Sequence, residues 1–258
     1  TLQIEPPARR ERLVTFLKQA WANPKAKIGL LILVSVVALS VFAPYIVPND
    51  PNETHVLAKS APPSAEYLFG TDHLGRDLLS RVLVGGRTSI LLGASATGLA
   101  LVLGVPIGLV AGFKGGVVDE ALMRYVDIQR TFPTFFVFLF VAYLFGASLL
   151  ALVLIFGLTG WGNTARLVRS EALQRVEEPY VDAARSAGAG TLDIVARHVV
   201  PNVSATLITN ATLLVPTLLL AEAGLAFLGV GNPTTPSWGQ TIAAGRSGLP
   251  TAWWVSTV

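Results

Sequence analysis

The chain has 258 residues, of which 52% are hydrophobic and only 14% are charged, and its formal net charge is +3. This composition is too apolar for the surface of an ordinary soluble domain and indicates a membrane protein. The lack of cysteine excludes disulfides, thiolate catalysis and cysteine metal sites, and the three histidines show no metal-ligand spacing.

The N-terminal region combines basic residues with a long apolar run. Residues 28–47 are long enough for a helix to cross a bilayer core, and no small-residue cleavage pattern follows them. Because cytoplasmic segments of membrane proteins are enriched in Lys and Arg, we interpret the positive charge as a topology signal and not as a nucleic-acid surface. We therefore predict a cytoplasmic segment at 1–27 and a first transmembrane helix at 28–47.

Residues 48–87 form a second, more polar segment that begins with a proline-rich turn region. We predict that it is extracytoplasmic and that either Thr71 or Asp72 caps a helix within it. Its charged residues Arg76, Asp77 and Arg81 are expected to form a polar latch on the outer surface, and we favour structural pairing over direct contact with a substrate-delivery protein.

Residues 88–258 carry the remaining apolar runs and are predicted to form the core transmembrane domain. Further spans are expected at 90–113, 122–145, 149–164 and 203–228. The run at 90–113 is rich in Gly and Ala, which predicts close helix packing within a bundle. Trp253 and Trp254 are typical interfacial anchors and are expected to open a sixth span, which the end of the chain truncates.

The loop at 165–202 holds too many charged residues to lie in lipid, so we place it in the cytoplasm. It has good helix formers at 166–176 and 179–187, a break at Gly188 and Gly190, and a second predicted helix at 191–200. Thr191 is the expected N-cap of that helix, which should end before Pro201. From these residues alone, a docking element for a partner protein and a plain solvated loop both remain open.

Polar residues within the apolar runs are further candidates. Glu222 is a carboxylate inside an apolar run, so it is predicted either to line a translocation path or to pair with Arg246 at the outer interface. Gln129, Asn163 and Asn210 are expected to form interhelical hydrogen bonds or to line a pore, and we favour the hydrogen bonds.

The cytoplasmic loop resembles the EAA loop of ABC importer permeases. Asp182-Ala183-Ala184 is followed four positions later by Gly188 and then by Val199-Val200-Pro201, and Asp182 stands where that family usually has Glu. In that family the first helix of the loop sits in a cleft of the ATPase. The resemblance therefore implies an ATPase-coupling role for Asp182, Ala183, Ala184, Ser186, Ala187, Gly188 and Pro201.

Other stretches resemble the dipeptide and oligopeptide permease group in particular. They are Phe69 to Asp77 with Ser80-Arg81, Ala221 to Gly229, and Pro236 to Gly239 with Gly245-Arg246. With the loop, the resemblance covers about residues 25–258. It implies an all-α, polytopic membrane protein of the type I importer permease kind, with about six transmembrane helices. Its candidate pore or outer-face residues are Glu222, Arg76, Asp77, Arg81, Trp238 and Arg246.

The resemblance implies a permease subunit that forms half of a pore for short peptides in a bacterial or archaeal cytoplasmic membrane, with its N-terminus in the cytoplasm. The sequence contains no G-x-x-x-x-G-K-[ST] phosphate loop, so we expect a non-catalytic chain without cofactor or metal. ATP and magnesium are then expected in two partner ATPase subunits, alongside a second homologous permease, an extracytoplasmic binding protein and surrounding lipid. Import of nickel chelates or another small solute is an alternative, as is an ion-gradient transporter with broken helices near mid-membrane.

Overall fold

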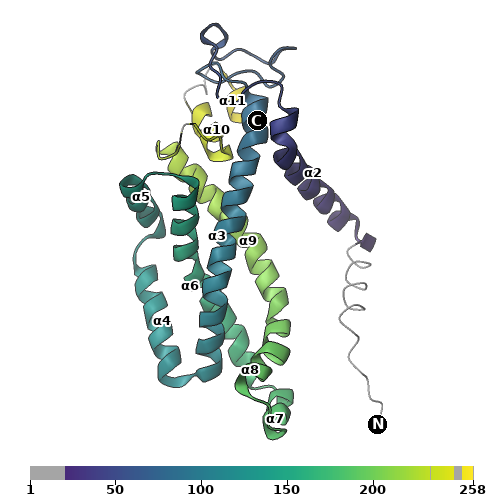
Figure 1. The fold of residues 1–258 in the computed structure, drawn as a ribbon, viewed down its shortest axis with the longest axis vertical. Coiled ribbons are helices and arrows are strands. Elements are labelled where there is room, and N and C mark those ends of the chain that lie inside the picture. The colour runs from purple at the N-terminus through teal and green to yellow at the C-terminus, as the bar shows by residue number, and fades with distance from the viewer. Residues whose placement is uncertain (1–20, 233, 247–251, 258) are drawn as a thin grey trace.

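The computed structural model describes residues 21–232, 234–246 and 252–257 (Figure 1). Within these residues the secondary structure is helical, apart from one isolated bridge between Thr71 and Asp77. The molecule is an elongated bundle with the long helix α3 at its centre. We call the end formed by loop 47–77, α10 (Trp238–Gly245) and α11 (Trp254–Thr257) the cap end. The opposite end, where α7 (Pro179–Ser186) lies, is the α7 end.

Four helices of the described chain are long and apolar enough to cross a membrane: α2 (Pro24–Ile46), α3 (Leu78–Lys114), α6 (Leu149–Val176) and α9 (Val200–Phe227). The bent pair α4 (Gly116–Thr131) and α5 (Thr134–Phe145) passes the same test as one broken span. The prediction of an all-α polytopic membrane protein is therefore confirmed.

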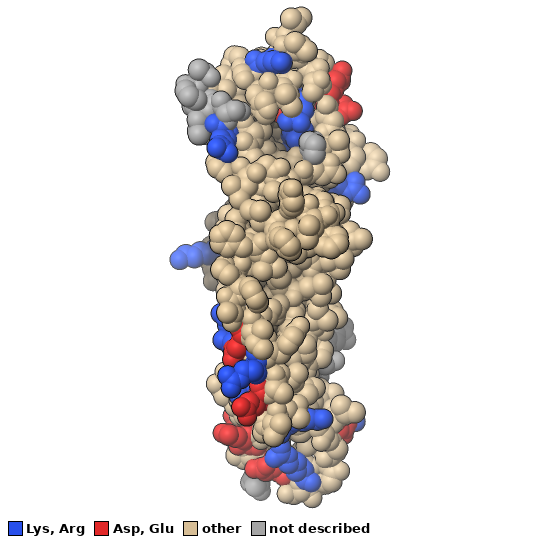
Figure 2. Space-filling view, turned by 90° about the vertical axis from the view of Figure 1, so that its left-hand side faces the viewer, with Lys and Arg blue, Asp and Glu red and all other residues tan. Residues whose placement is uncertain are grey.

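The remaining described elements are short. They are the 3-10 turn η1 (Val56–Ala58), α7 (Pro179–Ser186), α8 (Thr191–Ile194), the π-helix η2 (Val195–Val199), α10 (Trp238–Gly245) and α11 (Trp254–Thr257). Figure 2 shows Lys, Arg, Asp and Glu gathered toward the two ends of the molecule, while the middle of this face is largely free of them. A bilayer core therefore fits around the middle of the bundle.

The prediction of one continuous span at 122–145 was wrong, because the helix breaks between α4 and α5 with a bend of 73°. Proline cannot donate a backbone hydrogen bond, and it pushes the preceding residue out of the helical region. Phe132, just before Pro133, has extended dihedral angles (φ −81°, ψ 130°). The break lies about midway along α6 (Figure 1).

Helix α3 begins at Leu78, well before the predicted start at residue 90. Asp77 caps it by accepting a hydrogen bond from the Ser80 amide at 3.2 Å, so the prediction that Thr71 or Asp72 caps a helix was wrong. Asp77 has the extended backbone of an N-cap residue and directly precedes Leu78, the first residue of the helix.

The expected close packing of small residues is confirmed where α3 meets α6. A Cβ atom on Gly104 would lie 2.6 Å from the Trp161 carbonyl oxygen, and one on Gly108 would lie 2.4 Å from the Ala165 carbonyl oxygen. Only glycine lets the two backbones approach this closely. The α3–α6 pair therefore forms the rigid centre of the bundle.

Helix α6 runs without interruption to Val176, so the segment predicted as a separate helix at 166–176 is the second half of this helix. Two ion pairs join this half to α4: Arg166 with Asp127, and Arg169 with Asp119. Both pairs lie on the α7 side of the break and hold α4 beside α6.

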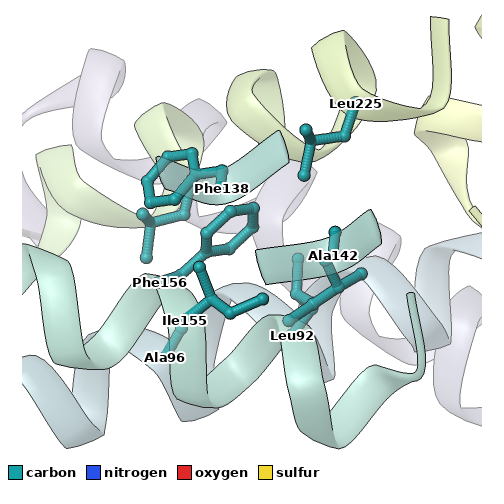
Figure 3. Close-up of a cluster of buried hydrophobic side chains, with 9 residues drawn as sticks. Leu92, Ala96, Phe138, Ala142, Ile155, Phe156 and Leu225 are labelled. Carbon is teal, nitrogen blue, oxygen red and sulfur yellow. The ribbon is translucent and has the colours of Figure 1, made fainter. Parts of the chain in front are cut away.

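The apolar core near the cap end is built from four helices (Figure 3). Phe138 and Phe156 pack edge to face with ring centroids 4.5 Å apart, a favourable aromatic geometry. The labelled members of this cluster are Leu92 and Ala96 of α3, Phe138 and Ala142 of α5, Ile155 and Phe156 of α6, and Leu225 of α9.

Helix α2 joins the bundle only near the cap end and leans away from it toward the N-terminus (Figure 1). Ser40 and Ala43 are its buried residues, and a Cβ on Gly86 would lie 2.3 Å from the Ser40 hydroxyl. Most of the other side chains of α2 are apolar and exposed, which suits a surface covered by lipid or by another membrane helix.

Candidate functional site

The α7 segment, residues 179–190, protrudes at one end of the molecule (Figure 1). Pro179 opens the helix, where its missing amide proton costs nothing, and the fully buried Val181 anchors it. The predicted coupling residues within α7 and directly after it differ in how exposed they are to solvent. Ala184 is half-buried, while the exposed ones are Asp182, Ala183, Ser186, Ala187 and Gly188.

Gly188 turns the chain at the end of α7. Its φ angle is +84°, and the turn is closed by hydrogen bonds from the Gly188 amide to the Arg185 carbonyl (2.9 Å) and from the Ala189 amide to the Ala184 carbonyl (3.0 Å). A residue with a Cβ loses about 1–2 kcal/mol in this backbone region. No described atom lies within 4 Å of a Cβ built there, so the space beside the turn is open to a partner.

Charged contacts tie α7 to the end of α3. The Arg185 guanidinium lies 5.5 Å from the ring centroid of Phe113, a cation–π distance, and 3.4 Å from the Asp182 carboxylate. The ion pair is exposed, so it contributes roughly 0–1 kcal/mol. Asp182 therefore orients Arg185 and does little to stabilise the fold.

The prediction that the second helix of the loop ends before Pro201 was wrong. The chain passes from α8 through the π-helix directly into α9, and Pro201 is the second residue of α9. A proline is tolerated in a first helical turn. Thr191 is not the N-cap, since Gly190 takes that position without a side-chain hydrogen bond. The segment after Gly188 is thus one helical path into a span.

The cap end contains a buried polar network. The Asp72 carboxylate accepts hydrogen bonds from the amides of Leu74 (2.8 Å) and Arg76 (3.0 Å) and from Arg76 Nε (2.7 Å). Arg81 is 1% exposed and donates from Nη1 to the Pro51 carbonyl at 2.9 Å. These contacts hold loop 47–77 against the start of α3.

The predicted latch does not lie on the outer surface, but the structural pairing that we favoured is confirmed for Arg76. Arg76, Asp77 and Arg81 are all buried, at 9%, 2% and 1% exposure, because loop 47–77 wraps around the first turn of α3. Arg76 pairs with Asp72, while Asp77 caps the helix. The three residues shape the cap and contribute little to its exposed surface.

The expected pairing of Glu222 with Arg246 was also wrong. Glu222 is 7% exposed and accepts a hydrogen bond from the Ser237 hydroxyl at 2.6 Å, beside a cavity of about 30 Å³. Arg246 instead lies 5.0 Å above the ring centroid of Phe227. Ser237 caps α10, so its contact with Glu222 holds α10 against α9.

Trp238 and Trp254 complete the packing of the cap end. Trp238 donates from its indole Nε1 to the Val82 carbonyl at 3.0 Å, and its amide donates to the Ser89 hydroxyl at 3.1 Å. The indole of Trp254 donates to the Thr71 carbonyl at 3.4 Å, so this residue packs into the cap. The sixth span remains a prediction.

A cavity of about 620 Å³ lies at the break between α4 and α5, and the sequence analysis did not predict it. The Phe132-Pro133 pair was a signal that would have located it. Gln129 Nε2 donates to the Leu158 carbonyl at 2.8 Å and the Thr164 hydroxyl donates to Asn210 Oδ1 at 3.2 Å, so the interhelical bonds expected of Gln129 and Asn210 are confirmed. Asn163 lines the cavity.

No cluster of three or more His, Cys, Asp or Glu residues that would suit a metal ion lies within the described ranges. The arrangement therefore offers three distinct features: an exposed bent helix at one end, a buried polar network at the other, and a cavity between them.

Comparison with known proteins assigns the family. Residues 104–256 match the family described as binding-protein-dependent transport system inner membrane component, and residues 14–63 match the N-terminal transmembrane domain of oligopeptide transport permease C. The oligopeptide transport system permease protein OppC of Bacillus subtilis is 37% identical over 229 residues, which cover 88% of this chain and 75% of the relative.

A second relative and a solved structure agree. The di/tripeptide transport system permease protein DppC of Pseudomonas aeruginosa is 37% identical over 250 residues, covering 93% of this chain and 82% of that protein. An inward-facing structure of the MetNI methionine ABC transporter shares the fold with a TM-score of 0.58 at 20% identity, over 70% of this chain and 85% of that one. This chain belongs to the family of inner membrane components of binding-protein-dependent transport systems.

Proposed function

We propose that the chain is a permease subunit of an ATP-driven importer and forms half of a translocation pore for short peptides. The relatives named above transport oligopeptides and di- or tripeptides, and the similarity extends over most of both chains. The observation that carries the coupling role is the α7 segment. It is exposed, it turns at a glycine with open space beside it, and it continues without a break into a span.

The α7 segment couples a partner ATPase to the bundle by moving as a rigid body. Val181 is fully buried beneath the helix, and Arg185 contacts Phe113 at the end of α3. The chain also continues from the α7 segment through α8 into α9. A displacement of α7 therefore moves α3 and α9 together. The close contact of α3 with α6 then carries the motion to a third helix. Rocking of such a packed unit opens the pore alternately to either side.

The remaining partners follow from the same proposal. A second homologous permease completes the pore, and two ATPase subunits bind ATP and magnesium at the α7 end. An extracytoplasmic binding protein delivers cargo at the cap end. Residues 1–27 and the loop 165–202 then lie in the cytoplasm and residues 48–87 outside, an orientation supported by the excess of Lys and Arg on the inner side.

An ion-gradient transporter was the rival, and the break between α4 and α5 is a feature expected of it. The two charge pairs on the α7 side of that break, Arg166 with Asp127 and Arg169 with Asp119, tie α4 to α6. Family membership favours the importer.

Reconstitution in lipid vesicles tests the proposal. The chain with its permease partner, ATPase subunits and binding protein is expected to import a radiolabelled dipeptide only when ATP is present in the ATPase compartment. The chain alone is expected to hydrolyse no ATP and to import nothing. Dipeptide uptake by the chain alone under a proton gradient would contradict the proposal.

A further inference from the structure

We infer that the cavity at the α4–α5 break is a cargo-binding site in which Arg130 binds the C-terminal carboxylate of a short peptide. This inference rests on the proposed import function and assigns a place and a charge preference to the cargo. The cavity is bordered by α4, α5, α6 and α9. Neither the predicted pore residue Glu222 nor the cap residues contribute to it.

The position of the break suits a site within the membrane. Arg130 lies near the middle of the bent span formed by residues 116–145, and Gln129 beside it bonds to the Leu158 carbonyl, partway along α6. Irregular backbone at membrane depth is tolerated only where it is buried in protein or lines a water-filled cavity. The break at Phe132-Pro133 borders such a cavity.

The cavity has the size and the walls of a small-molecule site. Its volume of about 620 Å³ falls within the range of roughly 300–1,000 Å³ typical of ligand pockets. Its lining includes phenylalanine rings, and two of them, Phe138 and Phe156, appear in Figure 3. Such walls accept varied apolar side chains because they make few directional contacts. The aromatic lining residues are Phe132, Phe135, Phe138 and Phe156.

Among the described residues, Arg130 is the only charged one that lines the cavity. The nearby carboxylates are engaged elsewhere, since Asp127 pairs with Arg166 and Glu222 accepts a hydrogen bond from Ser237. Within the described residues the Arg130 side chain has no ion pair or hydrogen bond. A cation at membrane depth without a partner calls for an anionic ligand.

A peptide carboxylate matches this cation well. The guanidinium group presents a planar fork of donors that binds a carboxylate through two parallel hydrogen bonds. Asn163 also lines the cavity, and its side-chain amide makes no hydrogen bond within the described part of the chain. An amide both donates and accepts, so it can pair with a peptide bond of the cargo. The site thus binds the backbone and the C-terminal carboxylate of a peptide and accepts different side chains.

The test compares two cargoes in the complete importer. Uptake of a dipeptide with a free C-terminal carboxylate and of the same dipeptide as its C-terminal amide is measured with wild-type complex and with Arg130→Gln. Loss of a charge-assisted hydrogen bond is expected to lower the ratio of free-acid to amide uptake by about tenfold. The binding protein is unchanged in both complexes, so its own preference cancels from the comparison.

Arg124→Gln is the matched control. Arg124 lies on the same helix, carries the same charge and is exposed like Arg130, but it faces Glu120 at 4.0 Å and does not line the cavity. This variant is expected to keep the wild-type ratio. An unchanged ratio in Arg130→Gln would overturn the inference, as would an equal fall of the ratio in Arg124→Gln.

Charge rescue keeps the test decisive if the glutamine variant assembles poorly. The chain contains no cysteine, so Arg130→Cys introduces a single thiol into it. Modification of this thiol with a cationic aminoethyl reagent is expected to restore the free-acid preference, whereas a neutral methyl reagent is expected not to. Parent complex treated with each reagent controls for thiols in the partner subunits. Equal ratios after both reagents would overturn the inference.

The outcomes separate this inference from the proposed function. If the wild-type complex imports neither peptide with ATP, the proposed function fails. If it imports peptides but the ratio does not depend on Arg130, the function stands and the assignment of the carboxylate site is wrong.

Discussion

The cap end and the α7 segment both carry the residues that resemble importer permeases, but the structure uses these residues in opposite ways. In the cap, Asp72, Arg76 and Arg81 are buried and bond to each other or to backbone. In the α7 segment, Asp182 and Gly188 are exposed and border open space. A characteristic motif can therefore maintain shape in one region and present a surface in another, and burial distinguishes the two.

The largest effect is expected from Asp72→Ala in the cap. This change removes the acceptor of two backbone amides and leaves the Arg76 guanidinium buried without its partner. Breaking a buried pair in this way costs roughly 3–5 kcal/mol. Thermal unfolding of the purified complex should show a marked loss of stability, while molecules that remain folded should keep the wild-type ratio of peptide imported to ATP hydrolysed.

Glu53→Gln is the control for that experiment. Glu53 lies in the same loop and loses the same charge, but its side chain is 59% exposed. It is expected to be stable within about 0.5 kcal/mol. If Asp72→Ala proved as stable as Glu53→Gln, the cap network would not hold the loop as described.

Gly188→Trp is expected to have the next largest effect, on coupling and not on the fold. The indole would occupy the space beside the α7 turn and block a partner, so uptake should fall at least about tenfold. The strained backbone should cost only about 1–2 kcal/mol. ATP hydrolysis and peptide uptake measured on the same complex report the coupling ratio.

Gly116→Trp is its matched control. Gly116 also has a positive φ (+54°) and open space around it, and it lies in the turn between α3 and α4 at the same end of the molecule. Its backbone strain is similar, but it lies outside the α7 segment. Equal uncoupling by both variants would mean that the α7 segment is not the specific contact.

A smaller effect is expected from Arg185→Gln, which removes the cation–π contact with Phe113 and the ion pair with Asp182. The exposed cation–π contact contributes about 0.5–1 kcal/mol, and the exposed ion pair adds little to it. Import should therefore fall by about twofold to fivefold with little change in melting temperature. Arg197→Gln, which removes the exposed pair with Asp193, should not change import.

The smallest effect is expected from Asp182→Glu. The side chain is exposed, and one more methylene keeps the charge beside Arg185. Uptake within about twofold of wild type would fit an exposed pair of low energy. Loss of uptake would instead show that the length of this side chain matters to the partner.

Local sequence signals predicted the parts of this molecule that depend on neighbouring residues. The apolar runs predicted the spans, and the small residues of 90–113 predicted close helix packing, which the structure places against α6. Gly188 predicted the bend after α7. The break at Pro133 had an equally local signal, but the continuous apolar run after it masked that signal.

The errors at Glu222 and Arg81 have a different cause, since each depended on contacts between distant residues. Glu222 meets Ser237 because α10 folds back onto α9, and Arg81 reaches Pro51 because loop 47–77 wraps around α3. Periodicity and charge counts carry no information on such contacts. Phe132-Pro133 marks the place of the α4–α5 break, but the size and walls of the cavity there depend on the packing of four separate helices.

Amide hydrogen exchange of the permease with and without its ATPase subunits tests the contrast between the two regions most directly. Exchange of the backbone amides at 179–190 is predicted to slow at least about tenfold in the full complex, because a partner covers the exposed α7 segment. The amides of 71–81 are predicted to exchange slowly in both samples. Equal exchange of 179–190 in the two samples, or ATPase-dependent protection confined to 71–81, would contradict this account.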